Sequence, residues 1–326
     1  MVGTVARTLP GDLAGMRSCT YDSSTMTKRK VDWVVRSAPN SARRQPFDIL
    51  SPAAQTVPLV FASPHSGTDY DPGFIASSQL DQLTLRRSED SFVDELFEGA
   101  PDAGAPLLRA RFPRVYLDPN REPWELDPNM FEDELPAWVN STSLRVAGGL
   151  GTIARVVTSG AEVYRGKLKF AEAERRIRTL YVPFHEAVQD LLAATVDRFG
   201  VAILVDCHSM PSVGGPMDRD PGHERADVVL GDRYGTSCAR AVTAAAEETL
   251  TDLGYKVARN DPYAGGFTTR NYGRPNSGVH SLQIELKRSL YMDEVRIERL
   301  PEMAELAANM DKLVAALAGL DHATLS

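Results

Sequence analysis

The chain has 326 residues, of which 43% are hydrophobic and 25% charged, and these values are typical of a globular protein with a large core. The formal net charge of -8 argues against a nucleic-acid-binding surface, and no apolar run is long enough to span a bilayer. The three cysteines, Cys19, Cys207 and Cys238, are too few and too far apart for a disulfide framework or a CxxC zinc site, so we expect a cytoplasmic protein.

Residues 1–45 differ from the rest of the chain. They are rich in Ser, Thr, Arg and Pro, show no hydrophobic period, and lack the basic start and apolar segment of a signal peptide. We expect a disordered tail over residues 1–45 and a single domain over residues 46–326.

From residue 57 onward, short apolar runs alternate with helical patterns. Strands are predicted at residues 57–62, 201–205, 227–230 and 279–286, with a hairpin or strand pair within 105–117. Helices are predicted at residues 169–199, 236–253 and 294–317, and Gly200 and Gly254 end the first two. This alternation predicts a mostly parallel sheet with helices on both faces, whose functional site lies beyond the carboxyl ends of its strands.

Two of the predicted strands lead directly into a histidine. His65 lies in SPHSG at 63–67, and His208 lies in DCHSM at 206–210. A histidine at such a position can cap a loop by hydrogen bonding, but two at one edge of a sheet favour a shared metal ion, because neutral imidazole is a good zinc ligand. A catalytic zinc commonly takes a third protein ligand. Asp90 is the first choice and Glu89 the alternative, although these acids also suit the first turn of a helix.

The segment LQIELK at 282–287 alternates apolar and polar residues. Gln283, Glu285 and Lys287 therefore share one face of a strand. A carboxylate buried in an otherwise apolar strand is costly unless it is paired or functional. Glu285 therefore either accepts a proton from a metal-bound water or pairs with Lys287 or Arg288.

Two predicted loops contain an arginine at a position typical of anion-binding residues. Arg121 follows Asn120 at a predicted strand end, and Arg270 lies in the glycine-rich segment GGFTTRNYG at 265–273. Guanidinium binds carboxylate through two parallel hydrogen bonds, although a solvated surface charge is the common alternative. The glycine-rich segment matches neither a Walker A motif nor GxGxxG, so nucleotide binding is not supported. His185, in YVPFH, is predicted to be structural.

Taken together, these segments resemble the N-formylglutamate amidohydrolase family. The resemblance runs in order from about residue 57 to 294 and rests on SPHSG, EDSFVDEL, LDPNR, YRGKLKFAEAERRI, YVPFH, DCHSMPS, GGFTTRNYG and LQIELKRSLYMDE. It implies a three-layer α/β/α sandwich around a mostly parallel mixed sheet, related to zinc carboxypeptidases and succinylglutamate desuccinylases. The HxxE spacing of the carboxypeptidases is absent, because Thr68 stands three residues after His65.

The resemblance also implies an activity and a set of roles. It implies one zinc ion held by His65, Asp90 and His208, with Glu285 as general base and Arg270 assisting catalysis. Substrate contacts would come from Asn120, Arg121, Arg270 and Arg288. The expected reaction converts N-formyl-L-glutamate to formate and L-glutamate, within amino-acid catabolism such as histidine degradation.

The sequence leaves two other classes of function open. One is a related deacylase that acts on another N-acyl amino acid or on a peptidoglycan fragment. The other is a non-enzymatic metal-binding α/β module. We expect a small-molecule substrate as the partner, with no nucleic acid and no membrane, and the sequence leaves the oligomeric state open.

Overall fold

The computed structural model describes residues 45–157, 159–216, 218–321 and 325. The tail expected over residues 1–45 therefore lies outside the described residues, except for Gln45. Within the described ranges, no helix combines the length and the apolar character that crossing a bilayer requires.

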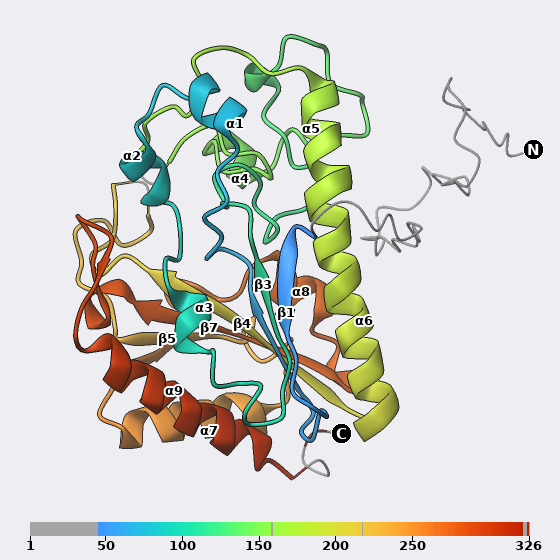
Figure 1. Cartoon of the computed structure of the whole chain (residues 1–326), viewed down its shortest axis with the longest axis vertical. Helices are drawn as coiled ribbons and strands as arrows, with labels where there is room; N and C mark the ends of the chain where they lie inside the picture. The colour runs from blue at the N-terminus through green and yellow to red at the C-terminus, as the bar shows by residue number, and fades with distance from the viewer. Residues whose placement is uncertain (1–44, 158, 217, 322–324, 326) are drawn as a thin grey trace, which may run out of the picture. The chain divides into compact units, whose positions relative to one another are not determined.

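A seven-stranded mixed sheet forms the centre of the fold, with strand order β1-β3-β2-β4-β7-β5-β6 (Figure 1). The four inner strands β3, β2, β4 and β7 run parallel to one another, which confirms the mostly parallel sheet. At the edges, β1 pairs antiparallel with β3, and β5 pairs antiparallel with β7 and parallel with β6. The strands are β1 Phe47–Leu50, β2 Leu59–Ser63, β3 Leu107–Ala110, β4 Ala202–Met210, β5 Val228–Gly231, β6 Val257–Arg259 and β7 Val279–Lys287.

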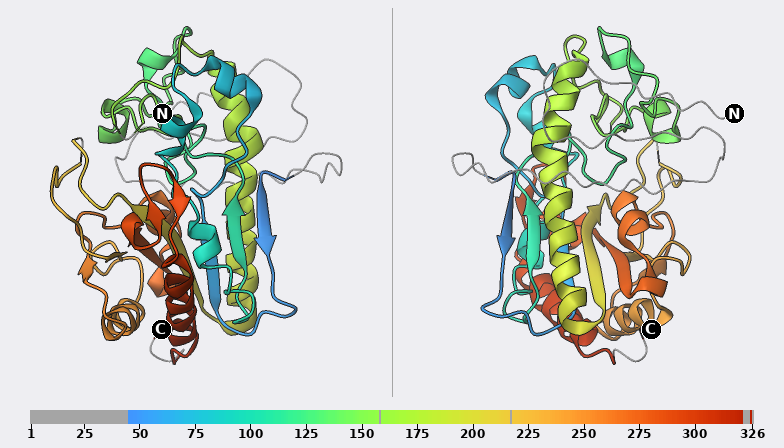
Figure 2. Two further views of the ribbon diagram at one scale, coloured as in Figure 1. Left: turned by 60° about the vertical axis from the view of Figure 1, so that its left-hand side comes forward. Right: turned by 90° about the vertical axis from the view of Figure 1, so that its right-hand side faces the viewer.

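Helices cover both faces of the sheet, so the fold is the expected three-layer sandwich (Figure 2). One face packs against α6, and the other packs against α3, α7 and α9. The helices in the described residues are α1 Pro72–Ser77, α2 Gln82–Arg86, α3 Val93–Leu96, α4 Leu144–Ala147, α5 Phe170–Arg176, α6 Val182–Phe199, α7 Arg240–Asp252, α8 Phe267–Tyr272 and α9 Met303–Ala318.

The alternation of β4 decides where the site lies. Ile203, Val205 and Cys207 belong to the core on the α7 and α9 side. On the other face, Ala202 and Leu204 pack in the core that α6 covers, and the same face then becomes polar. Because side chains alternate along a strand, the next two residues on that face are Asp206 and His208, at the carboxyl end of the strand.

The longest predicted helix is confirmed as a continuous run. α5 passes through a π-helical turn, Ile177–Tyr181, into α6. Gly200 ends α6 with a φ of 77°, a left-handed conformation that glycine adopts without a steric penalty. Figure 1 shows α1, α2 and α4 beyond the end of the sheet, with the long helix running from that region down along the strands.

Two predicted elements differ from the structure. No hairpin forms within residues 105–117, where β3 ends at Ala110 and a turn follows in which Tyr116 N and Leu117 N donate to Pro113 O. Proline lacks the N–H group that would extend a ladder there. The last helix begins at Met303, because residues 292–299 fold into the small hairpin of β8 Met292–Asp293 and β9 Glu298–Arg299.

Candidate metal and catalytic site

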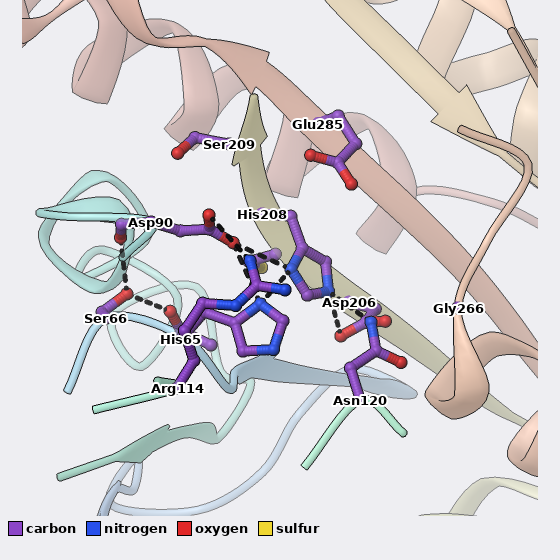
Figure 3. Close-up of polar contacts among 12 residues, drawn as sticks. His65, Ser66, Asp90, Arg114, Asn120, Asp206, His208, Ser209, Gly266 and Glu285 are labelled. Atoms are coloured by element: carbon purple, nitrogen blue, oxygen red, sulfur yellow. Dashed lines mark hydrogen bonds and ion pairs between the residues drawn. The ribbon is translucent and has the colours of Figure 1, made fainter. Parts of the chain in front are cut away.

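Three buried side chains meet at the carboxyl ends of β2 and β4 (Figure 3). His65 Nδ1 lies 3.2 Å from Asp90 Oδ2, His208 Nδ1 lies 3.0 Å from the same oxygen, and the two Nδ1 atoms are 3.1 Å apart. The structure thus brings together the three residues proposed as ligands from the sequence, and they form a group that could hold a metal ion.

The other ring nitrogen of each histidine faces a carboxylate. His65 Nε2 lies 2.8 Å from Asp118 Oδ1, and His208 Nε2 lies 2.9 Å from Asp206 Oδ1. Histidines that bind metals usually donate the second ring N–H to such a carboxylate, which fixes the tautomer. The arrangement leaves both Nδ1 atoms as lone-pair donors toward the centre of the group.

Asp206 supports this tautomer at His208. The Asp206 side chain is fully buried, and neither of its oxygens has an aligned hydrogen-bond partner among the described residues. With a proton on Nε2, the N–H of His208 faces this carboxylate, and Nδ1 keeps the lone pair that can bind a cation.

With these tautomers, three electron-pair donors face one another at distances of 3.0–3.2 Å. Such a contact is repulsive unless a cation lies between the atoms. Two imidazole nitrogens and one carboxylate oxygen are a common ligand set for a divalent transition metal. The residues present therefore fit a metal ion.

Asp90 is held in place from several sides. Its backbone N–H donates to His65 O at 3.1 Å, and its Oδ1 accepts from Arg288 Nη2 at 3.1 Å and from Arg114 Nη1 at 3.5 Å. Burial alone would raise the pKa of Asp90, but the nearby His208 and His65 side chains and the charge of Arg114 hold it well below its usual value. The carboxylate therefore stays ionised, and Oδ2 points toward the histidines.

Glu285 lies on β7 beside this group. The register pairs it with His208 on β4, so the two side chains share a face of the sheet, and Figure 3 shows both at the same edge. Glu285 Oε1 accepts from Gln283 Nε2 at 2.8 Å, and Gln283 Oε1 in turn accepts from Gly266 N at 2.8 Å. Burial raises the pKa of Glu285, which suits a group that takes up and releases a proton.

Glu89, the alternative acidic ligand, faces a different set of partners. Its carboxylate accepts from Tyr70 Oη at 2.7 Å, from Ser91 Oγ at 2.8 Å and from Arg86 Nε at 3.1 Å. The structure does not bring its side chain together with the two histidines, and Asp90 occupies that place.

Two of the predicted substrate-binding arginines are already occupied by protein groups. Arg121 is buried, donates to Leu150 O at 2.9 Å and lies 3.4 Å from Asp118 Oδ2. Arg288 is also buried, and it donates to Ser209 Oγ at 3.2 Å besides its contact with the candidate ligand carboxylate. These contacts give both arginines a role in shaping the site, and their contact with substrate stays a prediction.

Asn120 is buried, whereas Arg270 is partly exposed. Asn120 reaches His208 through Nδ2, while its Oδ1 accepts from Thr268 N at 2.8 Å. Arg270 forms an ion pair with Glu122, and 49% and 40% of these two side chains are exposed. Apart from Arg288, the residues predicted to bind substrate thus lie on two adjoining segments, 120–122 and 265–270.

Sequence reasoning missed three residues that organise the site: Asp118, Asp206 and Arg114. Arg114 Nη2 donates to Asp118 Oδ2 at 2.9 Å, which links the carboxylate beside His65 to the one of Asp90. A signal existed for Asp206, which lies two residues before His208 on a strand and so shares its face. Asp118 and Arg114 lie in a turn whose path no sequence period indicates.

Comparisons with known proteins point to one family. The family model described as N-formylglutamate amidohydrolase matches residues 57–292. An N-formylglutamate deformylase of Pseudomonas aeruginosa is 30% identical over 253 residues, which are 76% of this chain and 86% of the relative. A deformylase of the same name from Pseudomonas putida is 25% identical over 73% of this chain and 83% of its own.

A solved structure extends the likeness to three dimensions. The crystal structure of N-formylglutamate amidohydrolase from Ralstonia eutropha JMP134 superposes with a TM-score of 0.78 and 37% identity, covering 84% of this chain and 98% of its own. A second structure, a gene product of Agrobacterium tumefaciens, shares the fold with a TM-score of 0.61 and 20% identity over 84% of this chain and 95% of its own. The chain belongs to the N-formylglutamate amidohydrolase family.

Proposed function

We propose that this protein hydrolyses N-formyl-L-glutamate to formate and L-glutamate, and that it does so with one zinc ion. The observation that carries the proposal is the meeting of His65 Nδ1, His208 Nδ1 and Asp90 Oδ2 at 3.0–3.2 Å, with a carboxylate behind each histidine. The names of the relatives support the substrate, since two of them are called N-formylglutamate deformylase.

His65, Asp90 and His208 would hold the metal. When bound, a zinc ion would polarise the formyl carbonyl and lower the pKa of a water molecule toward neutrality. Asp118 and Asp206 keep the histidine tautomers that such binding needs, and Arg288 keeps Asp90 turned toward them.

Glu285 would move the protons of the reaction. Gln283 occupies Glu285 Oε1, so Oε2 is the oxygen that takes a proton from the attacking water. The water oxygen forms a bond to the formyl carbon, and the bond from this carbon to the amide nitrogen then breaks. Glu285 Oε2 passes its proton to the departing amine, which leaves as the amino group of glutamate, while the formyl carbon leaves as formate.

Metal content and turnover test this proposal together. Protein purified without chelator should contain about one equivalent of zinc per chain, as expected for a site with three protein ligands. His65→Ala and His208→Ala should each remove the metal and the release of formate from N-formyl-L-glutamate. An unchanged metal content in both variants would overturn the ligand assignment. Zinc-loaded wild-type protein that leaves N-formyl-L-glutamate intact, yet hydrolyses an N-acetyl or N-succinyl amino acid, would overturn the substrate.

A further inference from the structure

Three arginines from three separate segments share one region beside the site. Arg145 belongs to α4, Arg233 follows β5, and Arg270 belongs to α8. Burial, followed by repulsion from Arg270 and Arg145, lowers the pKa of Arg233. Arg145 also repels Arg121, which lies next to Asn120. Like charges are thus gathered near the segments that adjoin the candidate metal ligands.

Direct contacts connect this region to the site. Arg233 Nη1 donates to Gly265 O at 3.1 Å. The next residue, Gly266, packs so closely on Asn120 that a Cβ atom there would lie 2.4 Å from its amide. Asn120 in turn reaches His208 at 3.2 Å. The guanidinium of Arg233 is therefore fixed on a backbone segment that contacts the residue beside a candidate ligand.

The charge of the three arginines is not balanced by the protein. Among the residues that the structure describes, no carboxylate lies within ion-pair distance of Arg145 or Arg233, and Arg270 pairs with Glu122 alone. In contrast, Arg114 and Arg288 pair with buried carboxylates of the site. A local excess of positive charge in a chain of net charge -8 attracts a small anion.

The backbone at Arg233 is also held in an unusual conformation. Arg233 and Tyr234 have φ values of 53° and 59°, a left-handed region that residues with side chains rarely adopt. Asn260 stabilises the turn, since its Oδ1 accepts from Asp232 N at 3.1 Å and from Tyr234 N at 3.2 Å. Strained positions of this kind persist where the surroundings fix them, and they cluster at ligand-binding sites.

We infer that Arg145, Arg233 and Arg270 bind the side-chain carboxylate of the acidic substrate, and that Arg233 sets the preference for an acid over an amide. The inference rests on the proposed function. The formyl group must reach His65, Asp90 and His208, and the side-chain carboxylate is several bonds away from it. Arg233 and Arg270 contact segments 265–270 and 120–122 rather than the candidate ligands, which matches this more distant group.

The test compares two substrates that differ only in this carboxylate, N-formyl-L-glutamate and N-formyl-L-glutamine. Arg233→Gln removes the charge and keeps a donor for Gly265 O. We expect kcat/KM for the glutamate substrate to fall about ten- to hundredfold, the usual range for a lost hydrogen bond to a charged group, while kcat/KM for the glutamine substrate stays unchanged. Arg270→Ala should also raise KM for the glutamate substrate.

Arg198→Gln is the matched control, because Arg198 is exposed in the last turn of α6, at the end of the sheet opposite the site. It should leave both substrates unaffected. An equal loss on both substrates in Arg233→Gln would overturn the inference. A third substrate, N-formyl-L-glutamate with its α-carboxylate replaced by an amide, tells the two carboxylates apart. If the loss caused by Arg233→Gln disappears with this substrate, Arg233 binds the α-carboxylate and the inference is overturned.

A binding measurement separates this inference from the proposed function. Calorimetric titration of the zinc-loaded protein with L-glutamate and with L-glutamine needs no turnover. Wild-type protein should bind L-glutamate at least about tenfold more tightly, and Arg233→Gln should abolish the difference. Equal binding of both amino acids by wild-type protein would refute the inference. If wild-type protein binds L-glutamate preferentially but does not hydrolyse N-formyl-L-glutamate, only the proposed reaction is refuted.

Discussion

Replacing Asp118 with asparagine tests whether the carboxylate behind His65 maintains the metal site. Oδ1 of Asp118 accepts from His65 Nε2 and from Asn120 N, each at 2.8 Å. Oδ2 accepts from Arg114 Nη2 at 2.9 Å and lies 3.4 Å from Arg121 Nη2. Every partner is a donor. An asparagine amide must place its own NH₂ group on one side or the other, so donors face donors in either orientation.

The size of the effect follows from these contacts. Each buried group left without a partner costs about 1–3 kcal/mol, so the free energy of unfolding of Asp118→Asn should fall by roughly that amount. Weakening the carboxylate behind a metal-binding histidine typically reduces metal affinity about 10- to 100-fold. This loss corresponds to about 1.4–2.7 kcal/mol of binding free energy. The ligands themselves are unchanged in this variant, so zinc should still bind, but more weakly.

Asp127→Asn provides the matched control. Asp127 is a buried carboxylate that accepts from Arg155 Nε at 2.8 Å and from Asn129 N at 2.9 Å, and it contacts no candidate metal ligand. Competition with a chromophoric chelator measures zinc affinity, and urea unfolding measures stability. Both variants should lose stability, and only Asp118→Asn should lose affinity. Wild-type zinc affinity in Asp118→Asn, or equal losses in the two variants, would refute the reasoning.

Two further predictions concern proton transfer and acid stability. Glu285→Gln should retain zinc and lower kcat by about 10²- to 10⁴-fold, the usual contribution of a general base, with little change in KM. If the variant instead keeps more than about a tenth of the wild-type kcat, Glu285 is structural. Burial lowers the pKa of His185 to about 4, although its hydrogen bond to Pro119 O opposes the shift. Because the unfolded chain has the higher pKa, near 6.5, this contribution to stability is fully present above about pH 6.5 and is lost as the pH falls toward 4. Urea unfolding should therefore show a loss of about 2 kcal/mol between about pH 7 and pH 5 that His185→Gln lacks, and an equal pH dependence of the variant would contradict the assignment.

The parts of the site that lie on strands could be predicted from the sequence. Apolar runs located β2 and β4, and each ends near a histidine, so His65 and His208 were expected at one edge. The alternation in β7 placed Glu285 on the polar face, and the register with β4 agrees. Such patterns are readable because burial of alternate side chains repeats every two residues.

The parts that depend on turns could not be predicted in this way. β1 and β6 are short edge strands of four and three residues, and neither has a period long enough to recognise. The cluster formed by Arg145, Arg233 and Arg270 depends on three connections whose paths are set by individual side chains, such as Asn260 beneath the turn at Arg233. Neither the charge pattern nor the hydrophobic pattern of the sequence predicts that these three arginines lie close together.

The separation of the candidate ligands along the chain has a consequence for folding. His65 and His208 are 143 positions apart, and Asp90 and His208 are 118 apart. These atoms can meet only after β2 and β4 have docked side by side, and pairings between distant segments form slowly because a long loop must close first. A cation held by these three residues would therefore recognise the assembled sheet. At a free concentration a thousand times its Kd, it would add about 4 kcal/mol to the stability of that state. Zinc would thus favour the native chain over partly folded chains, and zinc-depleted cells should degrade this protein faster.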